Sequence, residues 1–283
     1  MLMIESFRGY DGAALRYGRL RGEGPAESVL LYVPGLGGSV KGALAFLGAL
    51  RPLFGEIYGP DLRGFGLNSH VTVPQPVHYL DDLDAFWQEK SLQTHAPVTL
   101  CAISLGAVVA THWALAHPGQ FSRMMLVSPA FKPHAATFPW HYALQRLAGR
   151  LLRGESHQTT MPYTIAKLTR NPELLNAKEL MFTPPTVPTD FLLATRPFAD
   201  AAFQRLSELT LPTLVVVPGD DEVCDPNAMR RGYERIRAPK ILHDYGGLKH
   251  DALMEPESPQ IAADMAAWLQ NPELCPPAIV CRP

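Results

Sequence analysis

Short runs of apolar residues recur along the chain and are apolar at every position rather than at alternate ones. They are "VLLYV" (29–33), "PVTLCAI" (97–103), "RMMLVS" (123–128) and "TLVVVP" (213–218). A strand with two apolar faces is buried on both sides, which is typical of a parallel sheet covered by helices. Segments with helical patterns separate the runs, at 41–52, 77–93, 226–236 and 259–270. The sequence therefore predicts an α/β fold, with a mostly parallel central sheet covered by helices on both faces.

The segment from 99 to 116 is almost free of charge and is long enough to be considered as a membrane span. Its two halves differ, however. "PVTLCAI" has the composition of a buried strand, whereas "SLGAVVATHWALAHPG" is rich in alanine and ends at a Pro-Gly pair, as a helix does. We therefore expect a strand, an abrupt turn and a helix, with no transmembrane segment.

The alternation of strands and helices stops between residues 130 and 210, where prolines, aromatic residues and helical pieces replace the apolar runs. We interpret residues 130–210 as a mainly helical insertion, or cap, between the two parts of the α/β core, 1–129 and 211–272. Residues 273–283 form a Pro-rich tail. An insertion between two strands of such a sheet lies over the edge where α/β proteins bind ligands.

The formal net charge is −2, with 25 basic and 27 acidic residues and no long run of one sign. This balance gives no surface for nucleic acid or an anionic membrane. Glu5 and Arg8 interrupt the N-terminal stretch where a secretion signal would be apolar, so we expect a cytoplasmic protein. The four cysteines, Cys101, Cys224, Cys275 and Cys281, lack metal-binding spacing and are expected to be free thiols, with no bound metal.

Ser104 lies at the predicted junction of strand and helix, with Ala102 two residues before it and Gly106 two residues after. Except for the alanine, this is the G-x-S-x-G pattern of a nucleophile on a sharp turn, where small neighbours let the strand and helix approach. Taken alone, Ser104 could equally be the N-cap of the following helix. A catalytic serine also needs a base and an acid elsewhere in the chain.

His250 is the predicted base, because "DYGGLKHDALMEPES" places it on a loop after a strand-like segment, at the sheet edge where Ser104 lies. The acid is expected in "VVVPGDDEVCDP", directly after an apolar strand. This loop contains Asp220, Asp221, Glu222 and Asp225. The order Ser, Asp, His is that of the α/β hydrolases.

Two backbone N–H groups would stabilise the oxyanion of such a reaction. One is expected from Leu105, directly after the nucleophile. The other is expected from Leu36 in "YVPGLGGS", where Gly35 permits the turn after a buried strand.

With these residues in place, the chain resembles the serine hydrolases of the α/β-hydrolase fold, and among them the monoacylglycerol lipase and lysophospholipase group. The likeness rests on "VPGLGGS", "GPDLRGFGLNS", "AISLG", "PGDDEVCDP" and "GGLKHDALME". It implies a cap over the active site and hydrolysis of a small-molecule carboxylic ester, such as a monoacylglycerol or lysophospholipid, through an acyl-enzyme. No cofactor is implied.

The chain also departs from that pattern. Pro34 replaces the usual histidine before the oxyanion glycine. Ser69 comes one residue late in its motif, so Asp61, Arg63 and Ser69 are interpreted as structural turn residues. For the acid, counting from Gly219 selects Glu222 and counting back from Pro226 selects Asp221; we favour Asp221, with Asp225 as a helix cap.

The predicted cap is rich in large apolar side chains, which either line a substrate pocket or form the core of the insertion. They are Phe131, Phe138, Trp140, Tyr142, Met161, Tyr163, Met181, Phe182, Phe191 and Phe198. The same triad would also serve a thioesterase, an amidase or peptidase, or a C–C hydrolase. A ligand-binding protein without catalysis on the same fold is the remaining alternative.

Overall fold

A single twisted sheet runs through the molecule in the strand order β1-β2-β4-β3-β5-β6-β9-β10-β11. The structure, a computed structural model, describes residues 1–73, 75–92, 98–134, 158–160, 163–176, 186–271 and 279–281. The strands of the sheet are β1 (Leu2–Arg8), β2 (Ala14–Arg21), β3 (Val29–Val33), β4 (Glu56–Pro60), β5 (Val98–Ile103), β6 (Arg123–Val127), β9 (Thr213–Pro218), β10 (Lys240–Tyr245) and β11 (Ile279–Cys281). The β1–β2 and β2–β4 pairs are antiparallel. From β4 onward every neighbouring pair in this order is parallel.

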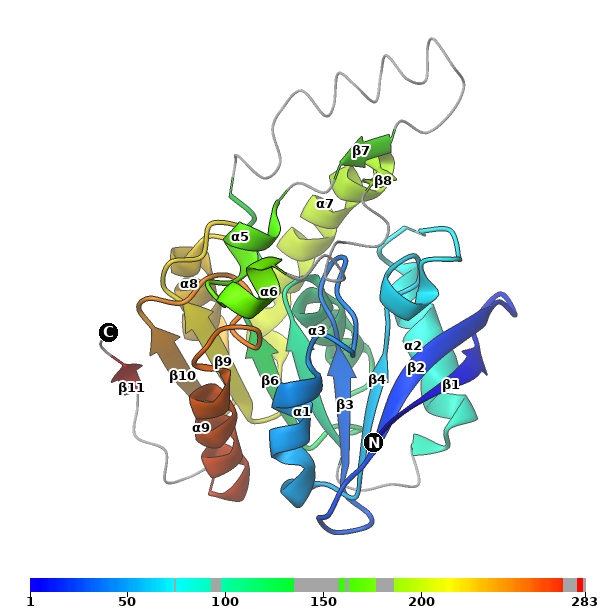
Figure 1. Ribbon diagram of the computed structural model, residues 1–283, viewed down its shortest axis with the longest axis horizontal. Helices are drawn as coiled ribbons and strands as arrows, with labels where there is room; N and C mark the ends of the chain where they lie inside the picture. The colour runs from blue at the N-terminus through cyan, green and yellow to red at the C-terminus, as the bar shows by residue number, and fades with distance from the viewer. Residues whose placement is uncertain are drawn as a thin grey trace.

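Helices cover the sheet on both faces (Figure 1). Helices α1 (Leu44–Leu50) and α9 (Ser258–Gln270) pack on one face, and α2 (His78–Glu89), α3 (Leu105–Ala116) and α8 (Pro226–Arg235) on the other. The side chains of β3 alternate between the two layers: Leu31 packs with α2 and α3, whereas Leu30 packs with α1 and α9. This explains why the strand is apolar at every position, and the predicted α/β fold is confirmed.

The four apolar runs are β3, β5, β6 and β9, and "KILHDY" is β10. Small differences at the ends have local causes. Strand β6 ends at Val127, one residue before the end of its apolar run, because Ser128 has a φ of 46°. Helix α2 ends at Glu89, before the predicted residue 93, and Ser91 has a φ of 51°. Four strands of the sheet were not predicted from the sequence: β1, β2, β4, and β11, which lies in the segment interpreted as a Pro-rich tail. No helix in the described ranges is long and apolar enough to span a membrane; the segment considered for that role is β5 followed by α3.

Further elements lie beyond the carboxyl ends of the parallel strands, as Figure 1 shows. They are β7 (Gln158–Thr160), α5 (Ile165–Leu168), α6 (Pro172–Asn176), β8 (Thr186–Pro188) and α7 (Thr189–Arg205). All fall within the predicted cap. Strands β7 and β8 pair in a small antiparallel sheet that the prediction of a mainly helical insertion did not include. Short 3₁₀ helices are η1 (Arg51–Leu53), η2 (Gly66–Asn68) and η5 (Leu206–Glu208).

Candidate active site

Ser104 lies on the turn between β5 and α3, in a strained backbone conformation. Its φ and ψ are 56° and −121°, a combination that costs a non-glycine residue about 1–3 kcal/mol. The start of α3 also lies against the end of the neighbouring strand β3, so that a Cβ on Gly106 would lie 2.3 Å from the carbonyl oxygen of Pro34 and 2.4 Å from that of Val33. Ala102 is fully buried. Position 106 therefore requires glycine, while a methyl group fits at 102.

The side chain of Ser104 points to a histidine instead of capping the helix. No side-chain hydrogen bond to the N-terminus of α3 is present at this position. The Oγ atom lies 2.8 Å from Nε2 of His250 instead. This geometry favours the nucleophile interpretation over the N-cap interpretation.

His250 is held on its other side by Asp221, whose Oδ2 lies 2.6 Å from Nδ1 of the imidazole. The second oxygen of Asp221 accepts hydrogen bonds from the N–H groups of Val223 and Cys224, at 2.7 and 2.9 Å. These bonds fix the carboxylate in the direction of the histidine. Ser104, His250 and Asp221 are all buried.

The charge of His250 is set by two opposing effects. Burial disfavours the imidazolium, but the charge of Asp221 and its hydrogen bond outweigh burial and raise the pKa of His250 above its usual 6.5. An imidazole with this partner is a stronger base than one in water, and it can take a proton from a hydroxyl group at Nε2.

The other acidic residues of the loop point elsewhere. Glu222 is exposed and pairs with Lys249, which lowers the pKa of the glutamate. Asp225 accepts a hydrogen bond from Asn227 N at 2.9 Å and caps α8, as predicted. Asp220 is exposed. Of the four candidates, Asp221 is the one in contact with His250.

The loop between β3 and α1 packs directly on Ser104. A Cβ on Gly35 would lie 2.9 Å from the Cβ of Ser104, so only glycine allows this approach. Leu36 on this loop and Leu105 at the start of α3 both line a small cavity beside Ser104. The two predicted oxyanion residues are thus brought to the same side of the serine.

Asp61 binds the end of this loop at Ser39 and Val40. This contact was not expected when Asp61 was interpreted as a turn residue. Its carboxylate accepts hydrogen bonds from Ser39 Oγ at 2.5 Å, Val40 N at 2.7 Å and Leu67 N at 2.8 Å. Burial raises the pKa of Asp61 to about 6, although these hydrogen bonds oppose the shift. Asp61 therefore joins the predicted oxyanion loop to the turn at 61–69.

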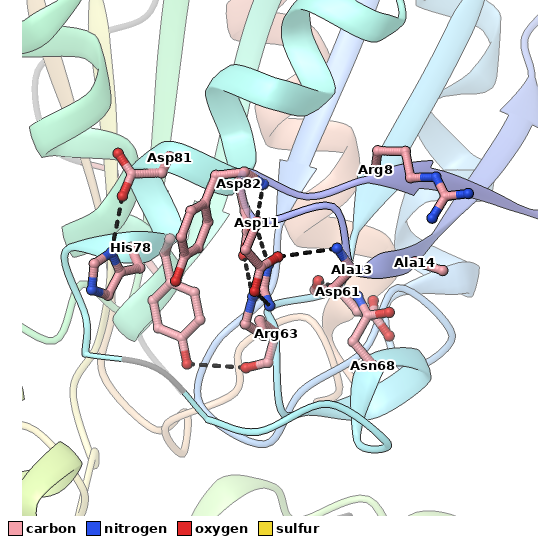
Figure 2. A network of polar contacts seen from close by, with 12 residues as sticks. Arg8, Asp11, Ala13, Ala14, Asp61, Arg63, Asn68, His78, Asp81 and Asp82 are labelled. Carbon is pink, nitrogen blue, oxygen red and sulfur yellow. Dashed lines mark hydrogen bonds and ion pairs between the residues drawn. The ribbon is translucent and has the colours of Figure 1, made fainter.

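Arg63 anchors the same turn to the rest of the core, and Figure 2 shows it between two carboxylates. The guanidinium group is nearly buried, with 4% of the side chain exposed. It donates two hydrogen bonds to Asp82 on α2 and two to Asp11 after β1. Tyr79 also donates to the carbonyl oxygen of Arg63. The predicted structural role of Arg63 agrees with these contacts.

Part of the predicted cap, residues 163–176, is bonded to the loop that carries His250. The N–H of Asp251 donates to Leu168 O at 2.8 Å, and Thr169 Oγ1 donates to Met254 O at 3.0 Å. Arg170 pairs at 2.7 Å with Glu255, whose side chain is fully buried. We refer to these contacts as the clasp.

A cavity of about 270 Å³ opens above Ser104 and His250. Apolar side chains of the predicted cap and the histidine loop line it, among them Ile165, Leu168, Leu174, Leu253 and Met254. Polar groups also line it, among them Lys41, Thr169 and Asp251. Burial raises the pKa of Asp251 to about 6. The smaller cavity beside Leu105, of about 30 Å³, is lined by Ala199, Val223 and Cys224.

The predicted cap side chains divide between the two expected roles. Phe131 and Phe191 are buried in the core, and Phe198 stacks on His112. Tyr163 lines both cavities. The other six, Phe138, Trp140, Tyr142, Met161, Met181 and Phe182, lie outside the described residues. Cys101 and Cys224 are free thiols, and no group of three metal-binding side chains occurs in the ranges that the structure describes.

The chain matches a known protein family over most of its length. Residues 24–257 match the α/β-hydrolase family described as "Serine aminopeptidase, S33". The chain belongs to this family. It is 25% identical over 224 residues to the monoacylglycerol lipase of Mycolicibacterium smegmatis, covering 75% of this chain and 77% of the relative.

Solved structures show the same fold. A monoacylglycerol lipase from Paleococcus ferrophilus superposes with a TM-score of 0.72 at 18% identity, covering 95% of this chain and 98% of that one. A soluble variant of the monoglyceride lipase of Saccharomyces cerevisiae, in complex with a substrate analog, superposes with a TM-score of 0.78 at 16% identity. The match covers 95% of this chain and 94% of that one. The predicted resemblance to this group is confirmed, and the predicted carboxylic ester hydrolase agrees with the family and these relatives.

Proposed function

We propose that the chain is a serine hydrolase that cleaves carboxylic esters through an acyl-enzyme. The observation that carries the proposal is the continuous chain of contacts from Ser104 Oγ to His250, at 2.8 Å, and from His250 to Asp221, at 2.6 Å. Ser104 and His250 line the larger cavity. A hydroxyl, an imidazole and a carboxylate in this order are the groups that acyl transfer requires.

In the proposed reaction, Ser104 Oγ attacks the ester carbonyl carbon while Nε2 of His250 takes the hydroxyl proton. The tetrahedral intermediate collapses, its C–O bond breaks, and His250 returns the proton to the departing alcohol. Water then repeats the sequence on the acyl-enzyme and releases the acid. Asp221 keeps Nδ1 protonated and Nε2 free to act as the base.

The negative oxygen of each intermediate would be held by the N–H groups of Leu36 and Leu105. Removal of one such donor typically raises the barrier by on the order of 3 kcal/mol. The glycine at 35 supports this role, because it allows the loop to approach Ser104 closely.

The proposed substrate is a monoacylglycerol or a lysophospholipid-type ester with a single acyl chain. The relatives named above are monoacylglycerol lipases, and the larger cavity combines apolar side chains with polar groups, as an amphipathic ester requires. Because the family description names an aminopeptidase, amide substrates belong in the same test.

The proposal is tested by labelling with a fluorophosphonate, followed by assays on p-nitrophenyl esters of increasing chain length, monoacylglycerols, lysophospholipids and aminoacyl p-nitroanilides. We expect labelling and ester turnover in the wild type, and neither in Ser104→Ala. Ser128→Ala is the matched control: Ser128 follows the next strand, has a φ of 46° and is buried, and its Oγ has no hydrogen-bond partner within the described residues.

An unlabelled wild type would contradict the serine-hydrolase proposal. Labelling without turnover of any substrate would favour a ligand-binding protein. Faster cleavage of anilides than of esters would reassign the reaction to peptide bonds.

A further inference from the structure

Tyr163 connects the cap to the loop that carries Leu36. Its phenolic O–H donates a hydrogen bond to the carbonyl oxygen of Leu36 at 2.8 Å, across 127 residues of sequence. The tyrosine is buried, with 8% of its surface exposed, and it lines both cavities next to Ser104. The contact therefore lies at the site itself rather than at the rim of the cap.

The loop needs such a contact because its own sequence does not fix its shape. Three of the five residues after Pro34 are glycines, at positions 35, 37 and 38, and Gly37 has a φ of 72°. Glycine permits many backbone conformations, including ones in which the N–H of Leu36 points away from Ser104. Asp61 holds the end of the loop at Ser39. Tyr163 holds its middle.

We infer that Tyr163 is a positioning residue that sets the oxyanion loop for catalysis, so that the oxyanion donors form when the cap is seated on the core. The inference rests on the proposed function. A bonded Leu36 carbonyl restricts rotation about the backbone of Leu36, and its N–H then stays directed at the position of the oxyanion. The clasp seats the segment 163–176, to which Tyr163 belongs.

Two other roles for Tyr163 predict different results. Its ring centroid lies 6.5 Å from that of His250, so it could instead adjust the base. It could also act only as a wall of the cavity. Tyr163→Phe separates the three, because it removes the hydroxyl group and keeps the ring.

The experiment compares Tyr163→Phe with the wild type on matched oxo and thiono esters, in which sulfur replaces the carbonyl oxygen. Sulfur is a weak hydrogen-bond acceptor, so cleavage of a thionoester depends little on the oxyanion donors. We expect kcat for the oxo ester to fall about 10-fold, since one hydrogen bond no longer holds the loop. The thiono rate and KM should change little, so the ratio of oxo to thiono rates falls.

Tyr79→Phe is the control. Tyr79 is also buried and donates to a backbone carbonyl, that of Arg63 at 3.2 Å, but it lines neither cavity. This variant should keep the wild-type ratio, and thermal melting verifies that both variants are folded.

The inference is overturned if Tyr163→Phe slows both esters equally, changes only KM, shifts the acidic limb of the pH profile, or has no effect. These outcomes differ from failure of the proposed function, in which the wild type cleaves neither ester or Ser104→Ala remains active.

Discussion

Oδ2 of Asp221 lies 2.6 Å from Nδ1 of His250, whereas the adjacent Glu222 is exposed and pairs with Lys249. Asp221→Asn should therefore lower kcat by on the order of 10³–10⁴-fold with little change in KM, because the amide no longer holds the correct tautomer of His250. Glu222→Gln, the matched neutralisation one residue away, should remain close to the wild type. Steady-state kinetics on one ester decide between them, and the reverse result would transfer the role to Glu222.

The pH dependence follows from the raised pKa of His250. The base must be neutral to accept a proton, so kcat/KM should fall as the pH falls through an inflection above 6.5. In Asp221→Asn the charge that opposes burial is lost, and the inflection should move to lower pH. A profile of kcat/KM between pH 4.5 and about 9 tests both statements; a wild-type inflection below 6.5 would contradict them.

The Arg63 network should contribute to stability more than to chemistry. Arg63→Ala leaves the carboxylate of Asp82, which is 6% exposed, buried without its cation. Breaking a buried pair in this way typically costs about 3–5 kcal/mol of unfolding free energy. Urea denaturation measures the loss. Arg205→Ala is the control. It removes an exposed ion pair with Glu208 and should leave the midpoint of urea denaturation unchanged.

Replacing two glycines by alanine should change the free energy of unfolding in opposite directions. Gly106→Ala places a Cβ 2.3 Å from a backbone oxygen that cannot move freely, so we expect a loss of at least about 1–3 kcal/mol. Gly48→Ala adds a methyl group in α1 with no atom within 4 Å, and it should stabilise the protein by about 0.5–1 kcal/mol. Equal melting temperatures for the two variants would show that the start of α3 and the end of β3 are less closely packed than described.

The parts of the fold predicted from sequence are those in which every residue of a strand is buried. Strands β3 and β9 coincide with their apolar runs residue for residue. The antiparallel strands β1 and β2 have exposed and partly buried positions along much of their length, so they show no apolar run. Strand β4 begins with Glu56 and ends in Gly-Pro, so it shows no continuous apolar run either.

At the site, sequence order and local motifs suggested Ser104 and His250. For the acid, the two ways of counting gave Asp221 and Glu222, and the favoured Asp221 is the one in contact with His250. The distinction between Asp221 and Glu222 arises when the loop folds and the N–H groups of Val223 and Cys224 turn one side chain inward. Tyr163 was one of ten large cap side chains with no distinguishing pattern. Its contact with Leu36 exists only in three dimensions.

The clasp bears on any attempt to replace the predicted cap with that of another protein. The buried carboxylate of Glu255 is on the core, and Arg170, which neutralises it, is on the cap. A cap without a cation at the position of Arg170 would leave the buried carboxylate of Glu255 unpaired, five residues from His250. In a chimeric protein, the predicted cap and the histidine loop should therefore be exchanged together.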